Sequence, residues 1–312
     1  MGTTVGDVTI RLALQIPNFS YGTPIAQLFP TVLAQAQEAE AAGFDAVFVM
    51  DHFYQLPMLG SPDQPMLEAY TALGALATAT EEVLLGTLVT GNTYRNPTLL
   101  AKIITTLDVV SQGRAVLGIG TGWFELEHTQ LGFDFGTFTQ RFSKLEEALQ
   151  ILVPMIAGDR VTFTGEYYRT EGAFAEPRMR DHIPLMIGGS GEKKTFGLAA
   201  RFFDHLNIIA SFAELPGKVD ALERRCADVD RDPSTLETSV LLTAIPDPTF
   251  TEDKLPEAMR GRMVVGGPDQ IAETVKTNVV DAGIDGVIVN LPSYRPGSIT
   301  EVGAALRPVV GH

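Results

Sequence analysis

The sequence predicts an α/β protein in which eight strands close into a (β/α)₈ TIM barrel. Short runs rich in β-branched and apolar residues alternate with segments of helical periodicity along most of the 312 residues. Several strand-like runs, such as 115–120, are apolar without alternation, which is typical of parallel strands covered on both faces. The number of runs favours a barrel over an open doubly wound sheet, the alternative fold. The expected strands are 9–16, 45–50, 83–90, 115–120, 184–188, 203–209, 238–244 and 285–291.

Helical segments between these strands carry apolar residues three or four positions apart. The stripe along 142–156 is the most regular of them. Thr23 followed by Pro24 predicts an N-cap and a first helical residue, and Ser298 with Glu301 predicts a capping box for the last helix.

Three stretches are longer than the bare strand-helix repeat requires: 53–68, 158–183 and 245–267. Alternating residues on both sides of Gly165 predict a small β-hairpin in the second of them. Insertions of this length usually cover or border a functional site. Because no linker-like composition interrupts the chain, we expect residues 1–312 to form one domain with loop insertions.

Composition excludes several classes of partner. A net charge of −15 disfavours binding to nucleic acid or to an anionic membrane surface. No apolar run reaches the roughly 18–20 residues of a membrane span, and no secretory signal is recognised at the N-terminus. The lone Cys226 cannot form an internal disulfide. These features predict a soluble cytoplasmic protein.

The C-terminal ends of barrel strands normally carry the reactive groups. Here they present amides, hydroxyls, glycines and one imidazole: Gln15–Asn18, Asp51–Phe53, Thr90–Asn92, Thr121–Trp123, Gly188–Ser190 and Asn290. The five histidines lack the spacing of metal ligands, so we expect no metal. The glycine motifs at 118–122 and 188–191 match neither the dinucleotide fingerprint nor the nucleophile elbow.

This set of side chains suits a flat redox ring. Amides and backbone groups would bind the ring's polar edge, an aromatic side chain would cover one face, and His52 would manage a proton near neutral pH. The turn Gly188, Gly189, Ser190 and Gly191 is predicted to receive phosphate, because a helix is expected to begin near Glu192. Lys193 and Lys194 could neutralise an acidic cofactor tail.

Three motifs then carry a family resemblance: Asp51-His52-Phe53, residues 86–90 with Arg95-Asn96-Pro97, and residues 117–123. The chain resembles the luciferase-like monooxygenase superfamily over essentially its whole length. It is most similar to the branch of oxidoreductases that use a deazaflavin, coenzyme F420. The resemblance implies a homodimeric barrel that transfers a hydride between F420 and a small organic substrate. An FMN-dependent two-component monooxygenase is the alternative, because relatives that bind FMN share the barrel and much of the glycine pattern.

The resemblance also assigns roles to residues. It implies a non-prolyl cis peptide near Leu88-Val89 and a proton-transfer role for His52. The implied cofactor contacts are Asp51, Leu88, Val89, Thr90, Thr121, Gly122 and the turn from Gly188 to Gly191. The chain departs from the family at Trp123, where a sugar-phosphate dehydrogenase of the branch has a catalytic glutamate. Glu127, one helical turn further on, is a possible substitute, so the catalytic candidates are His52, Trp123 and Glu127.

Overall fold

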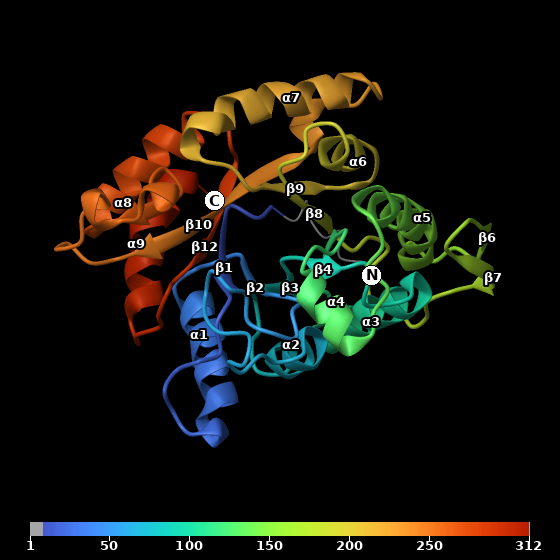
Figure 1. Cartoon of the computed structure of the whole chain (residues 1–312), viewed down its shortest axis with the longest axis horizontal. Coiled ribbons are helices and arrows are strands. Elements are labelled where there is room, and N and C mark those ends of the chain that lie inside the picture. Colours follow the sequence, from blue (N-terminus) through green and yellow to red (C-terminus); the bar gives the residue numbers. More distant parts are fainter. Residues whose placement is uncertain (1–8, 312) are drawn as a thin grey trace, which may run out of the picture.

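The computed structural model describes residues 9–311 and confirms the predicted closed barrel (Figure 1). Eight parallel strands pair in the circular order β1-β2-β3-β5-β8-β9-β10-β12, and β12 returns to β1. Each strand occupies a region that the sequence predicts. The barrel strands are β1 (Leu12–Ile16), β2 (Ala46–Val49), β3 (Leu84–Thr87), β5 (Ala115–Gly120), β8 (Leu185–Gly189), β9 (His205–Ile208), β10 (Glu237–Ile245) and β12 (Gly286–Asn290).

The predicted strand 83–90 is divided in two. After β3, a cis peptide between Leu88 and Val89 interrupts the pairing, and the chain resumes as β4 (Thr90–Gly91) against β5. The cis bond implied by the family resemblance is therefore confirmed. Within the insertion 158–183, β6 (Val161–Thr164) and β7 (Arg169–Ala173) form the predicted antiparallel hairpin, and β11 (Met263–Val265) in the third insertion pairs with β10.

Helices surround the strands on the outside, as Figure 1 shows. They are α1 (Leu28–Ala41), α2 (Ala69–Ala77), α3 (Pro97–Val110), α4 (Glu125–Leu131), α5 (Phe138–Ile156), α6 (Thr195–Phe202), α7 (Leu215–Ala227), α8 (Pro268–Val275) and α9 (Ser298–Val310). No helix within residues 9–311 combines the length and the apolar character needed to cross a membrane.

Two predicted helix starts are wrong. Thr23 does not cap α1, because a 3-10 turn at Ile25–Gln27 precedes the helix. Ser298 is the first residue of α9, not its cap, and its hydroxyl donates to the Arg295 carbonyl. The Glu301 carboxylate binds the Arg295 guanidinium instead of reaching back to the helix N-terminus. At α9, partners in the preceding loop compete with local capping.

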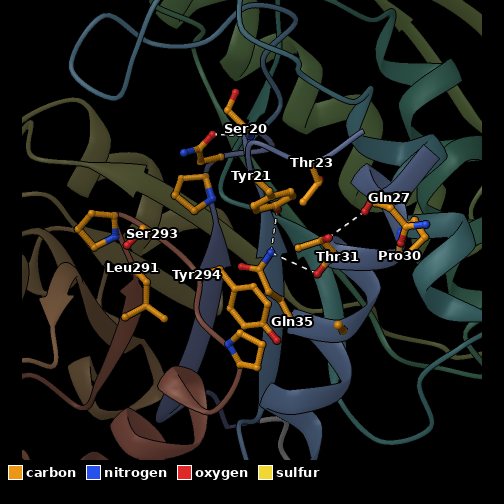
Figure 2. A pocket seen from close by; sticks show the side chains of 15 residues that line it. Ser20, Tyr21, Thr23, Gln27, Pro30, Thr31, Gln35, Leu291, Ser293 and Tyr294 are labelled. Atoms are coloured by element: carbon orange, nitrogen blue, oxygen red, sulfur yellow. Dashed lines mark hydrogen bonds between the residues drawn. The ribbon is translucent and has the colours of Figure 1, made fainter. Parts of the chain in front are cut away.

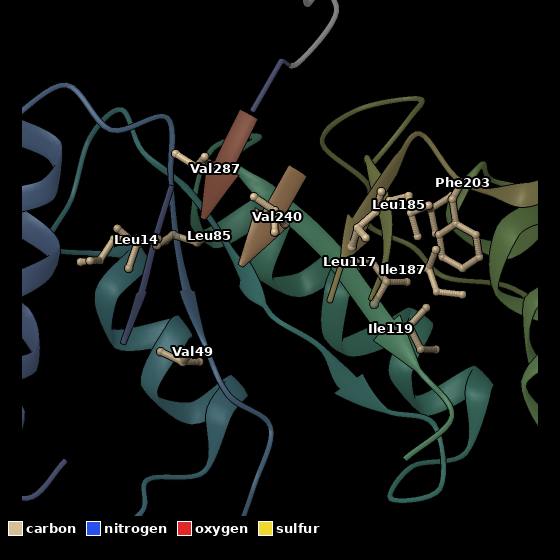
Figure 3. Packing of buried hydrophobic residues seen from close by; sticks show 14 of the residues in the cluster. Leu14, Val49, Leu85, Leu117, Ile119, Leu185, Ile187, Phe203, Val240 and Val287 are labelled. Atoms are coloured by element: carbon tan, nitrogen blue, oxygen red, sulfur yellow. The ribbon is translucent and has the colours of Figure 1, made fainter. Parts of the chain in front are cut away.

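The core has two parts because alternate residues of a strand point to opposite faces. Leu12, Leu14 and Ile16 of β1 point outward and join the large cluster between strands and helices. Figure 3 shows the equivalent outward residues of other barrel strands, such as Leu117 on β5. Ala13 points inward and belongs to a separate cluster that fills the barrel.

The barrel interior is apolar along several of its strands and carries buried amides at its C-terminal end. Its lower part contains residues such as Ala46, Val116 and Ile288. At the C-terminal end the inward residues are Gln15 and Asn290, whose side-chain amides are joined by a 3.0 Å hydrogen bond. Polar side chains also lie inside the barrel between β9 and β10, where His205 and Asn207 both contact the Ser239 hydroxyl. The amides at the C-terminal end lie where a ligand with a polar edge would be held.

Candidate active site

His52 follows β2 directly and is bound to a carboxylate from a distant segment. Its Nδ1 lies 2.9 Å from Oε2 of Glu127, on the short helix α4. Oε1 of Glu127 accepts hydrogen bonds from the backbone N–H groups of Phe53 and Tyr54, and Oε2 accepts a further one from the Tyr94 hydroxyl. Glu127 is fully buried and ties the segment after β2 to the loops after β4 and β5.

The charge of Glu127 determines the tautomer of His52. Burial by itself raises the pKa of Glu127, but the hydrogen bonds from His52, Tyr94 and Tyr54 outweigh it and hold this pKa below its usual value. The carboxylate is therefore ionised at neutral pH and can only accept hydrogen bonds. Nδ1 of His52 must then carry a proton, which leaves Nε2 of the neutral ring as a base. Nε2 makes no hydrogen bond within residues 9–311 and is not sealed from solvent.

Two aromatic rings restrict the His52 imidazole. Trp123 and Phe124 approach it edge-on, with ring centroids at 5.8 Å and 5.9 Å. Phe124 is buried, whereas Trp123 is 53% exposed, which is unusual for the largest apolar side chain. Trp123 therefore presents an apolar surface beside the basic nitrogen. Thr121, two positions earlier, is half-buried, and its hydroxyl lies 3.3 Å from the Gly122 carbonyl.

The Asp51 carboxylate is occupied by protein partners. Arg95 binds both of its oxygens, at 2.6 and 2.9 Å, and the Gly91 N–H donates to it at 3.0 Å. Arg95 also binds Glu68, so this guanidinium bridges loops and is not free for a phosphate. Asp51 is only 2% exposed. A direct cofactor contact from its side chain, as the resemblance implies, stays a prediction that this burial disfavours.

Thr90 is likewise enclosed. Its hydroxyl lies 2.6 Å from the hydroxyls of both Tyr70 and Thr87, in a chain of three hydroxyl groups in which the two threonines are fully buried. Burial raises the pKa of Tyr70 above its usual value, so the phenol stays protonated. This chain fixes the backbone on both sides of the cis peptide. Thr90 can offer a ligand its backbone but not its hydroxyl.

Val89 packs against the inner cluster of the barrel and lies over glycines of β5 and β8, called the glycine floor. A Cβ added at Gly118, Gly120 or Gly188 would lie 3.2, 2.9 or 3.3 Å from a Val89 methyl group. At Gly118 it would also lie 2.0 Å from the Thr87 carbonyl oxygen, so no larger residue fits there. Glycines at the end of a strand commonly mark a place where a ligand approaches the backbone. The structure instead fills that space with Val89, whose side chain is partly exposed. Leu88 is 9% exposed beside it.

A buried acceptor lies beside this floor. Asn207 points into the barrel from β9, next to Gly188 on β8. Its Nδ2 donates to Ser239, but its Oδ1 has no hydrogen-bond partner within residues 9–311 and is buried. Such an unpaired oxygen costs free energy unless a ligand donates to it. The barrel mouth therefore combines an apolar floor with an unfilled acceptor, which fits a flat ring with N–H groups at its edge.

The second glycine-rich strand end lies at the rim. Gly188 and Gly189 are half-buried, and Ser190 and Gly191 are exposed. Helix α6 begins at Thr195, three residues later than predicted from Glu192. Lys194 lies over the rings of Phe138 and Phe142, at 5.3 and 5.1 Å from their centroids. Lys193 is exposed as well.

Besides Asn207, sequence reasoning missed two further contributors to these sites. The first is Tyr94, whose hydroxyl binds Glu127 and whose ring packs 5.0 Å from that of Phe53. The second is Lys218, which binds the Ser190 carbonyl and the Glu192 carboxylate. Neither residue belongs to a recognisable motif, so nothing in the sequence pointed to them. Among the described residues, no group of three or more His, Cys, Asp or Glu side chains is placed to hold a metal ion.

A closed parallel barrel with polar groups gathered at the C-terminal ends of its strands is the architecture of a TIM-barrel enzyme. Comparison with known proteins then gives the family. The chain belongs to the Luciferase-like monooxygenase family, whose model matches residues 11–254.

Relatives and solved structures agree with this assignment. An F420-dependent glucose-6-phosphate dehydrogenase of Nakamurella multipartita is 35% identical, over 71% of this chain and 67% of that enzyme. The enzyme of the same name in Nocardia farcinica is 31% identical, over 82% and 86% of the two chains. An F420-dependent secondary alcohol dehydrogenase, solved with an F420-acetone adduct, superposes with a TM-score of 0.84 at 20% identity, over 97% of this chain and 99% of that one. At that identity, the superposition establishes the fold alone.

Proposed function

We propose that this protein is an oxidoreductase that transfers a hydride between coenzyme F420 and a small organic substrate. The observation that carries the proposal is the pairing of His52 with the buried Glu127 carboxylate, which leaves a basic nitrogen beside the exposed Trp123. The choice of cofactor is supported by the relatives that align along most of the chain, which are F420-dependent dehydrogenases.

Three groups in the barrel mouth would hold the cofactor. The Val89 side chain, raised on its glycine floor, would support the ring, and Asn207 Oδ1 would accept a hydrogen bond from the ring's edge. The turn from Gly188 to Gly191, with Lys193 and Lys194, would bind the phosphate-bearing tail. Bound F420 supplies the ring carbon that accepts or gives the hydride.

His52 handles the proton that accompanies the hydride. When an alcohol is oxidised, Nε2 accepts the hydroxyl proton as the carbonyl forms, and in the opposite direction the imidazolium returns it. The ionised Glu127 stabilises the positive charge that His52 gains. Because Glu127 is fully buried and bound by four donors, we assign it a positioning role in place of the substrate-facing acid considered from the sequence.

Trp123 shapes the site and does not replace the glutamate of the family. An indole N–H donates a hydrogen bond but does not titrate, so it cannot act as an acid or base. Its exposed face would instead exclude water from the space next to Nε2. Our assignment therefore makes His52 the only proton-transfer group of this site.

A parallel titration with F420 and FMN tests the choice of cofactor. We expect saturable binding of F420, with FMN at least about 100-fold weaker, equivalent to roughly 2.7 kcal/mol. Tighter binding of FMN than of F420 would favour the two-component monooxygenase alternative. The loaded protein should then reduce F420 with some member of a panel of small alcohols.

We also infer that the protein is a homodimer in the cytoplasm. The family resemblance supports the dimer. The lone and buried Cys226 suits a reducing compartment. Sedimentation at micromolar concentration should give twice the mass of one chain, and a monomer there would contradict the inference.

A further inference from the structure

A second cavity, of about 480 Å³, lies at the rim of the barrel (Figure 2). Its walls come from three segments that are far apart in sequence: residues 17–23 after β1, residues 27–35 of α1 and its preceding turn, and residues 291–296 after β12. None of its fifteen lining residues belongs to the His52 site. The volume lies within the range of about 300–1,000 Å³ that is typical of small-molecule sites.

The cavity wall carries no charged side chain. Four prolines and the rings of Tyr21 and Tyr294 provide stiff apolar surfaces, and amides and hydroxyls provide the polar groups. An ion that entered this cavity would lose water without gaining an opposite charge, which is costly. The lining therefore favours an uncharged ligand with a flat apolar body.

One buried amide gives the cavity a directed acceptor. Gln35 is only 6% exposed, and its Nε2 donates to the Tyr21 hydroxyl at 2.7 Å and to the Thr31 carbonyl at 3.4 Å. Because a carbonyl can only accept, the Thr31 contact fixes which end of the amide is the nitrogen. Oε1 of Gln35 makes no hydrogen bond within residues 9–311, yet it is not sealed from solvent, so it is open to the cavity.

Tyr21 provides the matching donor. Its hydroxyl oxygen accepts from Gln35, and its own proton has no acceptor among the described residues. Burial raises the pKa of Tyr21 to about 12, so the phenol keeps this proton at neutral pH. A free O–H donor and a free amide oxygen therefore stand side by side on adjoining residues of the wall, as Figure 2 shows for Tyr21 and Gln35.

We infer that this cavity is a second binding site, for an uncharged flat molecule that presents an N–H next to a C=O, such as a carboxamide, lactam or imide. The ligand carbonyl accepts from the Tyr21 hydroxyl, and its N–H donates to Oε1 of Gln35. Its ring packs between Tyr294 and the prolines of the wall. The site is independent of the hydride-transfer chemistry, because it shares no residue with the His52 site.

Benzamide is a suitable probe, used with the full-length protein loaded with F420 so that the barrel mouth is occupied. Titration followed by protein-observed NMR should give saturable binding, with a dissociation constant in the millimolar range, as expected for a ligand of this size. Benzoate has the same shape but a negative charge and should bind at least about tenfold more weakly, since its charge finds no partner. No saturation by benzamide, or equal binding of benzoate, would overturn the inference.

Variants locate the binding in this cavity. Tyr21→Phe removes the hydroxyl that donates to the ligand and also accepts from Gln35, and it should weaken benzamide binding at least about tenfold. Ala34→Trp, at an exposed position of α1, should fill the cavity and abolish binding while the melting temperature stays close to that of the parent. Tyr294→Phe is the matched control. The Tyr294 hydroxyl donates to the Glu38 carboxylate and not to the ligand, so the affinity for benzamide should change less than about twofold. Unchanged affinity in both Tyr21→Phe and Ala34→Trp would place benzamide elsewhere and refute the site.

Discussion

Two buried Asp–Arg ion pairs lie at opposite ends of the barrel. They are chemically alike, but we expect them to affect stability and turnover differently. Asp51 and Arg95 form a two-point ion pair at the C-terminal end, next to His52. Asp108 and Arg180 form a similar pair at the N-terminal end, where Arg180 also binds the Ala115 carbonyl at the start of β5. The exposed side-chain fractions are 1% and 9% for the first pair, and 0% and 7% for the second.

The surroundings of the two pairs explain the difference. The pair at the N-terminal end of the barrel, called the lower pair, joins α3, β5 and the segment that leads to β8. It therefore contributes to the closure of the barrel. The pair at the C-terminal end, called the upper pair, holds Asp51, the residue before His52. Through Arg95 it also binds Glu68, the last residue of the insertion that follows His52. The comparison teaches that the loss of one member of a buried ion pair should destabilise the fold at either end, whereas only the upper pair lies beside the proposed proton-transfer residue.

Removing the base should have the largest effect at the upper end. His52→Ala should lower turnover by about 10²- to 10⁴-fold, because proton transfer loses its acceptor. F420 affinity should change less than about twofold, since His52 is not among the groups assigned to hold the cofactor. Steady-state kinetics and F420 titration measure the two quantities. A large loss of affinity with unchanged turnover would reject the role of His52.

Breaking each ion pair tests the comparison itself. Arg180→Met should lower the free energy of unfolding by about 3–5 kcal/mol, because Asp108 is left as an unpaired buried charge. Turnover per folded molecule should stay within about twofold of the parent. Arg95→Met should cost similar stability and also reduce turnover. Denaturant unfolding and activity assays measure both variants, and equal effects on turnover would remove the distinction between the two ends.

Glu127→Gln should have a smaller effect on chemistry. The amide keeps the shape but cannot stabilise a protonated His52, so turnover should fall by about 10- to 100-fold, as for other groups that orient a reactive ligand. Because Glu127→Gln leaves the volume of the buried side chain unchanged, any loss of turnover reports the loss of the negative charge and not a change in packing. Turnover equal to that of the parent would show that His52 needs no carboxylate partner.

The same variant gives a pH dependence with a defined sign. The pKa of Glu127 is lower in the folded protein than its unfolded value of about 4.3. Its stabilising contribution is therefore complete above the unfolded pKa and is lost as the pH falls through the folded one. The difference in unfolding free energy between parent and variant should shrink below about pH 4. A difference that stays constant from pH 7 to pH 3 would contradict the ionised state.

His182 at the lower end should give the smallest effect. Its hydrogen bond to Asp204, at 2.9 Å, raises the pKa of this imidazole against the opposing effect of burial. Stability from this pair is present below the unfolded value of about 6.5 and is lost as the pH rises through the folded pKa. Because the side chains are 63% and 44% exposed, His182→Gln should cost less than about 1 kcal/mol at pH 6 and leave turnover unchanged. A loss of turnover would connect the lower end to the chemistry.

The fold was predictable because its signal is repeated. Eight apolar runs such as 115–120 each predict one buried strand of the barrel. An error at one end of a strand does not change the topology. Helix starts depend on single contacts and were less accurate. Ser298, for example, binds the Arg295 carbonyl in the preceding loop, and no periodic pattern encodes this.

The position of the candidate site is still a prediction from the sequence, and the contacts that build it are visible only in the structure. His52 and the glycine turns were predicted because they follow the C-terminal ends of strands, which every barrel of this kind gathers on one face. The contact between His52 and Glu127 joins residues that are 75 positions apart in the sequence. It also depends on which side of α4 is buried, and α4 is too short for a periodic pattern to predict that side. The role of Val89 was also hidden, because only the structure shows that the glycines at 118, 120 and 188 surround its side chain.

The central claim concerns one nitrogen atom, and NMR of protein with ¹⁵N-labelled histidine observes it directly. We predict that the neutral form of His52, assigned by comparison with His52→Ala, carries its proton on Nδ1, with Nε2 unprotonated. In Glu127→Gln this preference should weaken. A neutral His52 protonated on Nε2 in the parent protein would contradict the account, because the basic nitrogen would then face the carboxylate and not the barrel mouth.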